Sequence, residues 1–387
     1  MDSSKKKTGR AKELSIILTG GGTAGHVWPH FALFEGNNSL ALAFRDHKLN
    51  VHYVGSLTGM EKDLVTSTQP TWIYHSISTG KLRRYFSLQN FLDPFKIILG
   101  FIQSFILIGK IKPSVIFSKG GFVSTPIVWA AWLRGVPAVI HESDATPALA
   151  TKLTLPFAYK GLFAFGETLN KVPLPLKKRS IETGLPVRSS LFSATKEEGL
   201  RFFNFTADIK VILIFGGSLG AQSLNAKVFD ILPELVQKYQ IIHLTGKGNS
   251  KDALIRLEKE RYQQYEFLKE DMKYAYAAAD LAICRAGASS IFELAAARIP
   301  MILLPLGLHA SRGDQIINAR IFSQKGWAQW IDEPTFQKET AIKLIDSTMG
   351  SLEDRKKALS NAPSVEAANK ISDLLWEIIL NYNKQAL

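Results

Sequence analysis

A buried strand followed by a glycine-rich loop and a helix occurs near the start of each half of this chain, and this repetition constrains the fold more than any other feature. Leu14 to Thr19 is apolar and runs into the loop Gly20 to Gly25. In the second half, Val211 to Phe215 runs into Gly216 to Ala221. Strand, glycine loop and helix form the opening of a Rossmann-like unit. Two such openings predict two doubly wound α/β domains with parallel sheets that face each other.

The first glycine loop also raises a dinucleotide-binding alternative. Gly20, Gly22 and Gly25 match the G-x-G-x-x-G pattern of dinucleotide-dependent oxidoreductases. That pattern expects an acidic residue at the end of the second strand to hold the adenine ribose. The second strand is expected at Val51 to Val54 and is followed by glycine and serine. The dinucleotide interpretation loses weight because no acidic residue stands there.

The length of 387 residues is large for a single core and favours two domains. The periodic pattern pauses around Thr183 to Arg188, and we place there the boundary between a first domain (1–185) and a second (186–365). Apolar residues at helical spacing predict a closing helix at about 366–387 that packs back on the first domain. The single cysteine, Cys284, and a lysine-rich start rather than a signal peptide predict a cytoplasmic protein.

The charge of the chain is strongly basic, because 47 lysines and arginines stand against 34 acidic residues and give +13. This charge suits nucleic acid, an anionic membrane surface or a phosphorylated substrate, and by itself does not choose among them. A basic peripheral membrane protein or nucleic-acid-binding protein is therefore the non-enzyme alternative. That alternative leaves the glycine loops without a role.

The segment from Lys81 to Ile108 combines basic residues at its start with clustered aromatic and aliphatic residues. It is either a buried core helix or a surface that rests on an anionic bilayer, with Lys81, Arg83 and Arg84 near the lipid head groups. Its longest uncharged run, Ile97 to Gly109, is shorter than the roughly 20 residues of a spanning helix. No membrane span is therefore predicted.

One stretch of the second half, from Cys284 to Arg320, carries the residue types of a nucleotide site. A strand expected at Asp280 to Cys284 leads into the turn Ala286 to Ser290 and a helix, whose first N–H groups favour a phosphate or a ribose. Glu293, one helical turn later, is suited to accept two hydrogen bonds from vicinal hydroxyls. Gln315 is suited to bond a sugar from the other side. The plain alternative is an ordinary helix start with a solvated glutamate.

A second glycine loop, Ser118 to Ser124, follows a strand expected at Val115 to Phe117 and offers another anion cradle. The next strand, Pro137 to Ile140, leads into His141 to Asp144, at the edge where open parallel sheets place their ligands. Taken alone, His141 is interpreted as a hydrogen-bonded loop histidine. The sequence contains no evident metal-ligand cluster, so neither a metal nor a cofactor is expected.

Several blocks of the sequence resemble, in the same order, the motifs of the MurG family of peptidoglycan N-acetylglucosaminyltransferases. They extend from Thr19 to about Trp330 and read TGGGTAGH, FSKGGFVSTP, HESD, TGLPVR, FGGSLGA and CRAGASSIFELAAARIPMILLPLGLHASRGDQIINA. The resemblance implies a GT-B fold and an inverting transfer of N-acetylglucosamine from UDP-N-acetylglucosamine to lipid I, an undecaprenyl-diphosphate-linked muramoyl peptide, which gives lipid II. It also implies a peripheral protein on the cytoplasmic face of the cell membrane, in contact with anionic inner-leaflet lipids and with no nucleic acid.

The resemblance also assigns roles to residues that match the motifs. It implies sugar contacts from Thr23, Ala24, Gly25 and Gln315, diphosphate contacts from Arg188 and Ser218, uridine contacts from Ala288, Ser289, Ser290, Ile291, Phe292 and Glu293, a uracil contact from the backbone of Lys269, and acceptor-diphosphate contacts from Gly120, Gly121 and Ser124. Two positions depart from the family. Ala24 stands where many members have glycine, and Asp144 stands where many have asparagine, so Asp144 is a substrate-binding candidate without an assigned contact.

Sugar transfer from a nucleotide diphosphate passes through an oxocarbenium-like transition state. It needs a base for the acceptor hydroxyl and positive potential at the leaving diphosphate. His26, at the tip of the first glycine loop, is the candidate base, and Arg188 with the helix start after Ser218 is the candidate source of positive potential. The enzyme alternative is another GT-B transferase with a lipid acceptor, such as a diacylglycerol glycosyltransferase.

Overall fold

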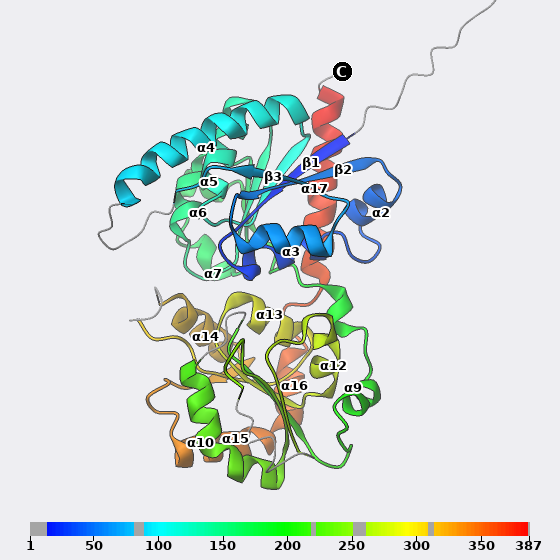
Figure 1. Cartoon of the computed structure of the whole chain (residues 1–387), viewed down its shortest axis with the longest axis vertical. Coiled ribbons are helices and arrows are strands. Elements are labelled where there is room, and N and C mark those ends of the chain that lie inside the picture. Colours follow the sequence, from blue (N-terminus) through cyan, green and yellow to red (C-terminus); the bar gives the residue numbers. More distant parts are fainter. Residues whose placement is uncertain (1–13, 81–88, 218–221, 251–260, 309–312, 386–387) are drawn as a thin grey trace, which may run out of the picture.

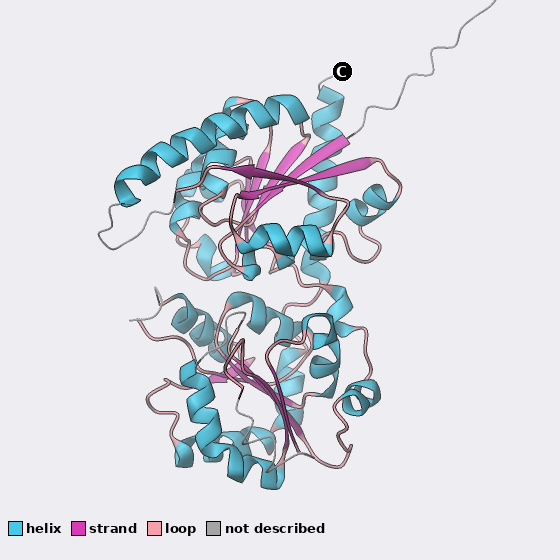
Figure 2. Cartoon of the chain, viewed as in Figure 1, coloured by secondary structure: helices cyan, strands magenta, loops and turns pink. Residues whose placement is uncertain are grey.

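The computed structural model of the protein describes residues 14–80, 89–217, 222–250, 261–308 and 313–385. Within these ranges the chain forms two α/β units that lie one above the other, as Figure 1 shows. Each unit is a parallel sheet with helices on both faces (Figure 2). The two doubly wound domains predicted from the glycine loops are therefore confirmed.

The first unit contains seven described strands in the order β3-β2-β1-β4-β5-β6-β7, all of them parallel to their neighbours. Their side chains alternate between two hydrophobic clusters, because Ile16 and Leu18 face one side of the sheet and Ile17 faces the other. The strand bounds are β1 Leu14–Thr19, β2 Leu49–Ser56, β3 Ile73–Ile77, β4 Val115–Ser118, β5 Ala138–Glu142, β6 Lys160–Phe163 and β7 Ser180–Glu182.

The second unit contains six described strands in the order β10-β9-β8-β11-β12-β13, again parallel. Their bounds are β8 Val211–Phe215, β9 Gln240–Leu244, β10 Tyr262–Tyr265, β11 Leu281–Cys284, β12 Met301–Leu303 and β13 Ala328–Trp330. The apolar and aromatic residues from Tyr265 to Leu268 also predict a strand in the sequence. This prediction is wrong, because β10 ends at Tyr265 and the chain then turns into the 3-10 helix Lys269–Asp271.

Helices cover both faces of each sheet and connect successive strands. In the first unit they are α1 Trp28–Ala32, α2 Ser39–Arg45, α3 Met60–Thr68, α4 Gln89–Ile111, α5 Ser124–Leu133, α6 Leu149–Thr154, α7 Gly166–Leu169 and α8 Leu174–Lys177, with 3-10 helices η1 Ala24–His26 and η2 Leu155–Phe157. The later ones are η3 Ser189–Phe192, α9 Lys196–Phe202, α10 Gln222–Lys238, η4 Lys269–Asp271, α12 Met272–Ala278, α13 Ala288–Ala296, α14 Asp314–Gln324, α15 Lys338–Met349, α16 Leu352–Leu359 and α17 Glu366–Gln385.

The last helix, α17, returns from the second unit and lies beside the sheet of the first (Figure 1). Ile371 and Leu375 on this helix share a hydrophobic cluster with Ile16 of β1. Polar contacts fix the same interface, since Ser39 Oγ donates to Asp373 Oδ1 at 2.7 Å. The chain therefore crosses between the units twice, once after β7 and once before α17.

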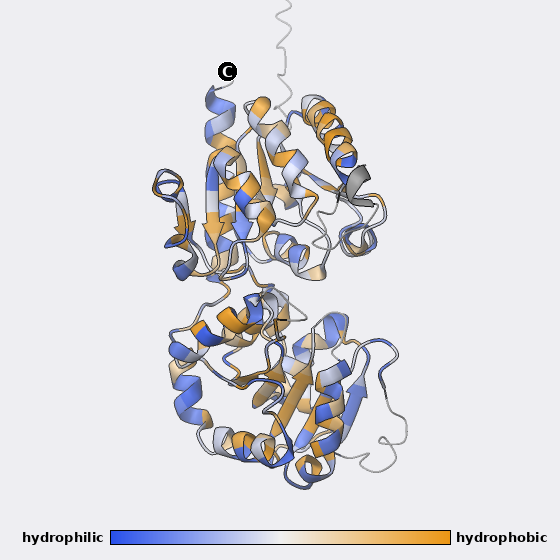
Figure 3. Ribbon diagram, turned by 90° about the vertical axis from the view of Figure 1, so that its left-hand side faces the viewer, coloured by the Kyte–Doolittle hydropathy of each residue, from blue (hydrophilic) through white to orange (hydrophobic). Residues whose placement is uncertain are grey.

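Helix α4 lies on the outside of the first unit and presents an apolar face to its surroundings (Figure 3). Phe95 is 71% exposed and Ile98 is 57% exposed. Within the described residues, the window Asp93–Ile111 is the one helical segment long and apolar enough to cross a membrane, judged by length and composition only, and 17% of it is buried. A wholly buried core helix is therefore ruled out for this segment. Lys81, Arg83 and Arg84 lie outside the described residues.

Candidate active site

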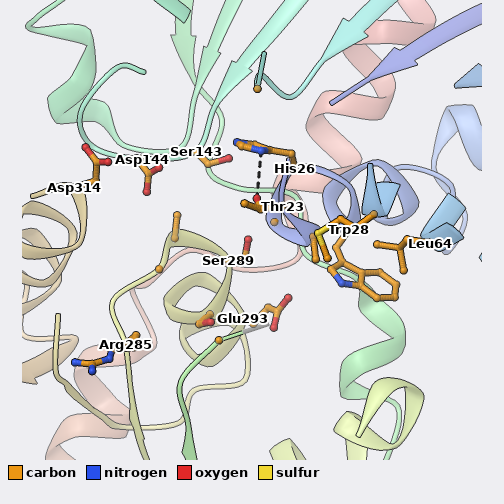
Figure 4. Close-up of a pocket in the computed structure, with 18 of the residues that line it drawn as sticks. Thr23, His26, Trp28, Leu64, Ser143, Asp144, Arg285, Ser289, Glu293 and Asp314 are labelled. Atoms are coloured by element: carbon orange, nitrogen blue, oxygen red, sulfur yellow. Dashed lines mark hydrogen bonds between the residues drawn. The ribbon is translucent and has the colours of Figure 1, made fainter. Parts of the chain in front are cut away.

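A cleft of about 980 Å³ separates the two units and is lined by residues of both. The first unit contributes the tip of its first glycine loop and the turn after β5, and the second contributes the start of α13 and of α14. Figure 4 shows that Thr23, His26 and Ser143 lie across this space from Ser289 and Glu293. The carboxyl-end loops of both sheets therefore meet at one site, which is where parallel α/β sheets place ligands.

The tip of the first glycine loop is held by bonds to its own backbone and to the neighbouring strand. Tyr53 donates its hydroxyl to Gly20 O at 2.7 Å. His26 Nδ1 lies 3.0 Å from Gly21 O and 3.3 Å from Thr23 Oγ1, and the second of these is drawn in Figure 4. Because a carbonyl oxygen only accepts, the contact with Gly21 O places the ring proton on Nδ1 and the lone pair on Nε2. Thr23, Ala24, Gly25 and His26 all line the cleft.

The first turn of helix α13 lies at the cleft, and only one face of this turn lines it. Side chains of Ala288, Ser289, Ser290 and Glu293 line the cleft. Ile291 and Phe292 do not, because they are 0% and 1% exposed and lie in the core of the second unit. The uridine contacts that the resemblance implies for Ile291 and Phe292 therefore fall to their backbone, and they stay a prediction. Gly25 approaches this turn so closely that an added Cβ would lie 3.1 Å from Ser289 Oγ.

Glu293 is partly buried at the cleft wall rather than solvated. Tyr276 donates its hydroxyl to Glu293 Oε2 at 2.7 Å. Burial raises the pKa of the Glu293 carboxyl, and the Tyr276 bond and the charge of Arg188 oppose this rise. The alternative of an ordinary solvated glutamate is therefore wrong.

Two arginines reach the cleft. The guanidinium of Arg188 lies over the ring of Trp28 at 4.0 Å, and its buried Nε has no hydrogen-bond partner among the described residues. The sequence analysis assigned no role to Arg285, although this residue lies in the stretch from Cys284 to Arg320 that was interpreted as a nucleotide site. Its guanidinium is 3% exposed and bonds Leu304 O at 3.0 Å and Glu333 Oε2 at 2.7 Å. Ser218, the other predicted diphosphate ligand, lies outside the described residues.

The start of α14 holds the remaining residue that was predicted to contact the donor sugar. Gln315 lines the cleft, and its Oε1 accepts from Leu306 N at 3.1 Å. One turn later, Asn318 Nδ2 donates to Asp144 Oδ1 at 3.0 Å across the boundary between the units. Burial raises the pKa of the Asp144 carboxyl, which also lines the cleft. Lys269 lines the cleft at the start of η4 and has a positive φ of 40°.

The second glycine loop packs directly on the first. Gly120 and Gly121 have φ of +88° and +82°, which favour glycine, and a Cβ on Gly121 would lie 2.4 Å from Gly21 O. Gly121 lines the cleft, whereas Gly120 and Ser124 do not. Ser124 is buried, and its hydroxyl donates to Gly120 O at 2.6 Å. Ser124 therefore braces the loop through its side chain.

Behind this loop lies a polar cluster that the sequence analysis did not assign. Lys119 Nζ lies 2.6 Å from His141 Nδ1 and 2.9 Å from Ser143 Oγ. His141 belongs to β5 and is 2% exposed, so its interpretation as a loop histidine is wrong. The strand continues two residues past Ile140, and all of its residues are buried. In the described part of the chain, no group of three or more histidine, cysteine or acidic side chains is arranged to hold a metal.

Comparison with known proteins agrees with this geometry. Residues 16–162 match the glycosyltransferase family 28 N-terminal domain, and residues 211–375 match the glycosyltransferase family 28 C-terminal domain. The chain is 43% identical over 365 residues, 94% of its length and 99% of the relative's, to the UDP-N-acetylglucosamine–N-acetylmuramyl-(pentapeptide) pyrophosphoryl-undecaprenol N-acetylglucosamine transferase of Lachnoclostridium phytofermentans. It is 42% identical to the protein of the same name from Clostridium botulinum, over 96% and 98% of the two chains.

Solved structures show the same architecture. The crystal structure of MurG from Acinetobacter baumannii superposes with a TM-score of 0.71 at 26% identity, covering 94% of this chain and 99% of that one. A UDP-GlcNAc 2-epimerase from Neisseria meningitidis, bound to UDP-GlcNAc, shares only the fold, with a TM-score of 0.64 at 13% identity over 96% of this chain and 100% of that one. On the family matches and on relatives above 40% identity over nearly the whole length, the chain belongs to glycosyltransferase family 28 and, within it, to the MurG family.

Proposed function

We propose that this protein transfers N-acetylglucosamine from UDP-N-acetylglucosamine to the C4 hydroxyl of the muramoyl sugar of lipid I, which forms lipid II for peptidoglycan synthesis. The names of the relatives at 42 to 43% identity state both the sugar donor and the lipid acceptor. The structural observation behind the proposal is the shared cleft, which His26, Arg188 and Glu293 all line and in which Figure 4 shows His26 across from Glu293. A transferase needs such a shared space, because donor and acceptor must meet in line.

The donor occupies the second-unit side of the cleft in this proposal. Glu293 accepts two hydrogen bonds from the ribose hydroxyls, and the first N–H groups of α13 face the uridine and its phosphate. The Nε–H of Arg188, which has no partner among the described residues, and the other N–H groups of its guanidinium donate to the leaving diphosphate. The ring of Trp28 stacks on the guanidinium and fixes its plane. Gln315 keeps its oxygen on Leu306 N and offers its amide hydrogens to the sugar.

His26 acts as the general base. With its proton on Nδ1 bonded to Gly21 O, the ring presents the Nε2 lone pair that removes the proton from the acceptor hydroxyl. As the hydroxyl oxygen attacks the anomeric carbon, the bond to the diphosphate breaks on the opposite face, so the configuration inverts. Arg188 stabilises the charge that develops on the departing UDP.

The unit limits proposed for this reaction are 1–185 and 186–365, with 366–387 assigned to the first domain. In support, β7 ends at Glu182, the second sheet begins at Val211, and α17 packs on β1 and α2. The first domain then carries the acceptor and the second the donor.

We further propose that the protein works as a peripheral protein on the cytoplasmic face of the cell membrane. The acceptor named for the relatives carries an undecaprenyl tail, so the protein must come to the bilayer. The exposed apolar face of α4 and the net charge of +13 favour anionic inner-leaflet lipids as its partner. No role for nucleic acid is proposed, because the glycine loops and Glu293 serve a nucleotide sugar.

A turnover assay tests the function directly. Purified protein is incubated with UDP-N-acetylglucosamine and a lipid I analogue, and release of UDP and formation of the β-linked disaccharide are measured. Diacylglycerol in place of the lipid I analogue tests the other lipid acceptor. Transfer to diacylglycerol but not to the lipid I analogue would reverse the acceptor assignment.

A further inference from the structure

A buried lysine lies between the two glycine loops. Lys119 follows β4 directly, precedes Gly120 and is 1% exposed. A Cβ added to Gly20 would lie 3.2 Å from its Cβ, so the lysine is enclosed by both loops. In the described ranges, no carboxylate lies within 4.0 Å of its Nζ. A buried ammonium without a contacting anion is costly, so this position needs an explanation.

The two groups that contact Nζ are neutral. His141 Nε2 lies 2.9 Å from Gly184 O, which can only accept, so the proton of the ring sits on Nε2 and Nδ1 accepts from Lys119. Burial and the charge of Lys119 hold the pKa of His141 well below its usual range. His30, on α1, is also fully buried, and burial and Lys119 lower its pKa in the same way. Neither histidine adds a charge at neutral pH.

The nearest carboxylates have their oxygens committed elsewhere. Glu142 accepts from Ser143 N at 2.9 Å and from Ala148 N at 2.8 Å. Asp144 accepts from Asn318. Burial therefore lowers the pKa of Lys119 to about 7, although Glu142 and Asp144 oppose the fall through their charge.

Ser143 connects this lysine to the cleft. Its Oγ accepts from Lys119 Nζ at 2.9 Å, which leaves its hydroxyl hydrogen to point to another group. Ser143 lines the cleft together with Gly121 and His26, as Figure 4 shows for Ser143 and His26. The cleft wall therefore presents a hydroxyl donor that is backed by a buried lysine.

We infer that Ser143 and Lys119 form the anion site for the diphosphate of the lipid acceptor, in which Ser143 donates to a phosphate oxygen and Lys119 supplies the countercharge from behind. This inference rests on the proposed function and adds two residues to it. The acceptor, rather than the donor, is the ligand because Ser143 belongs to the first unit and lies beside the second glycine loop, whereas Arg188 and α13 serve the donor. Lys119 is a positioning residue, since it does not reach the cleft itself.

Binding of the diphosphate then draws a proton onto Lys119. An anion next to Ser143 favours the ammonium form, so the pKa of Lys119 rises in the complex. Because the pKa of Lys119 is lowered to about 7 in the unbound protein, binding of the acceptor at pH 8 is expected to take up protons. Acceptor affinity consequently falls as the pH rises above about 7. Histidines of ordinary pKa do not titrate at pH 8 and add nothing to this uptake.

Calorimetry at pH 8 tests the inference, with a soluble lipid I analogue titrated into the protein in two buffers of different ionisation enthalpy. The wild type is expected to take up protons on binding, and Lys119→Met none. Lys152→Met, which removes an exposed lysine from α6, is the matched control and keeps the full uptake. Ser143→Ala, which keeps the lysine, is expected to raise the KM for the acceptor at least tenfold while the Kd for UDP stays unchanged.

Three results would overturn the inference. Equal proton uptake by wild type and a folded Lys119→Met protein would remove Lys119 from the site. Uptake upon titration with UDP alone would assign the anion to the donor. An unchanged acceptor KM in Ser143→Ala would exclude the Ser143 hydroxyl from the anion site. This variant tests the inference by itself if Lys119→Met does not fold. Absence of turnover by the wild type with the lipid I analogue would instead contradict the proposed function.

Discussion

Asn318 and Asp144 lie on different units and are joined by a hydrogen bond of 3.0 Å between Nδ2 and Oδ1. The same amide accepts from Ala145 N at 3.0 Å and donates to Ala286 O at 3.2 Å. Asn318 is 0% exposed and lies one turn after Gln315 on α14. A single helix therefore carries both a candidate donor contact and the contact that fixes the acceptor-side turn.

Replacing Asn318 by alanine is expected to destabilise the protein by about 3 kcal/mol, because it leaves the buried Ala145 N–H without a partner and removes the bonds to Asp144 and Ala286. The urea midpoint of unfolding measures this change. Asn361→Ala, at an exposed position after α16, is the control and is expected to stay within about 0.5 kcal/mol of the wild type. Equal midpoints for the two variants would show that Asn318 does not brace the boundary.

Glu293→Ala is expected to weaken UDP binding at least tenfold, since each charged hydrogen bond to the ribose contributes roughly 1.5 to 3 kcal/mol. Only the ionised carboxylate accepts two bonds, and burial raises its pKa. UDP affinity therefore falls as the pH drops through this raised pKa, at a higher pH than for an exposed glutamate. Tyr276→Phe removes the bond that opposes the rise and is expected to move the midpoint to still higher pH. Calorimetry from pH 4.5 to 8 measures both effects, and an unchanged Kd for Glu293→Ala would refute the ribose contact.

Arg188→Ala is expected to lower turnover and to weaken binding of the UDP diphosphate, and Arg188→Lys to restore only part of both, because an ammonium lacks the planar fork. Trp28→Leu tests whether stacking on Trp28 positions the guanidinium of Arg188. It removes the ring that lies 4.0 Å from the guanidinium and is expected to raise the Kd for UDP while leaving the binding of uridine unchanged. Full turnover with lysine at position 188 would reduce this residue to a general positive charge.

His26→Ala is expected to cut kcat by roughly a hundredfold or more with little change in the Kd for UDP. The control is His47→Asn, which changes an exposed histidine at a positive φ of 54° to a residue that tolerates this conformation. Stopped assays with saturating donor give kcat, and calorimetry gives Kd. Loss of UDP binding without a separate loss of kcat would make His26 a structural residue of the loop.

The elements with a strong local signal were predictable from the sequence. β1 and β8 begin and end at the predicted residues, because each is an apolar run that stops at a glycine loop. The position of β10 was predicted wrongly, because its residues Tyr262 to Tyr265 include two glutamines at a sheet edge. The more apolar Phe267 and Leu268 that follow it line the cleft instead. Hydrophobicity alone therefore pointed to the wrong residues.

Residues whose role depends on distant partners could not be found in the sequence. Arg285 meets Glu333, Asn318 meets Asp144, and Lys119 meets Ser143 only after the sheets have formed. The resemblance likewise named Ile291 and Phe292 as parts of a contiguous motif, although the helical period turns both toward the core. Spacing within a motif locates a site, and the fold decides which of its side chains reach the ligand.

The outer face of α4 provides the last prediction. Ile98 and Ile102 are 57% and 48% exposed and lie one turn apart on this helix. If this face dips into the bilayer interface, the double change Ile98→Glu and Ile102→Glu should abolish sedimentation with vesicles that contain anionic lipid, because it places charge against acyl chains. Leu174→Glu, at a position 79% exposed on α8, is the control and should sediment as the wild type does.

Salt separates the apolar from the electrostatic part of this attachment. Each basic residue near an anionic surface contributes on the order of 1 kcal/mol, and this contribution is screened within a Debye length. Changing Lys81, Arg83 and Arg84 to glutamate should weaken vesicle binding at low salt and leave a smaller difference at high salt. The Ile98 and Ile102 double variant should lose binding at both. Equal sedimentation of all variants and the wild type would place the membrane contact on another surface and leave α4 as scaffold.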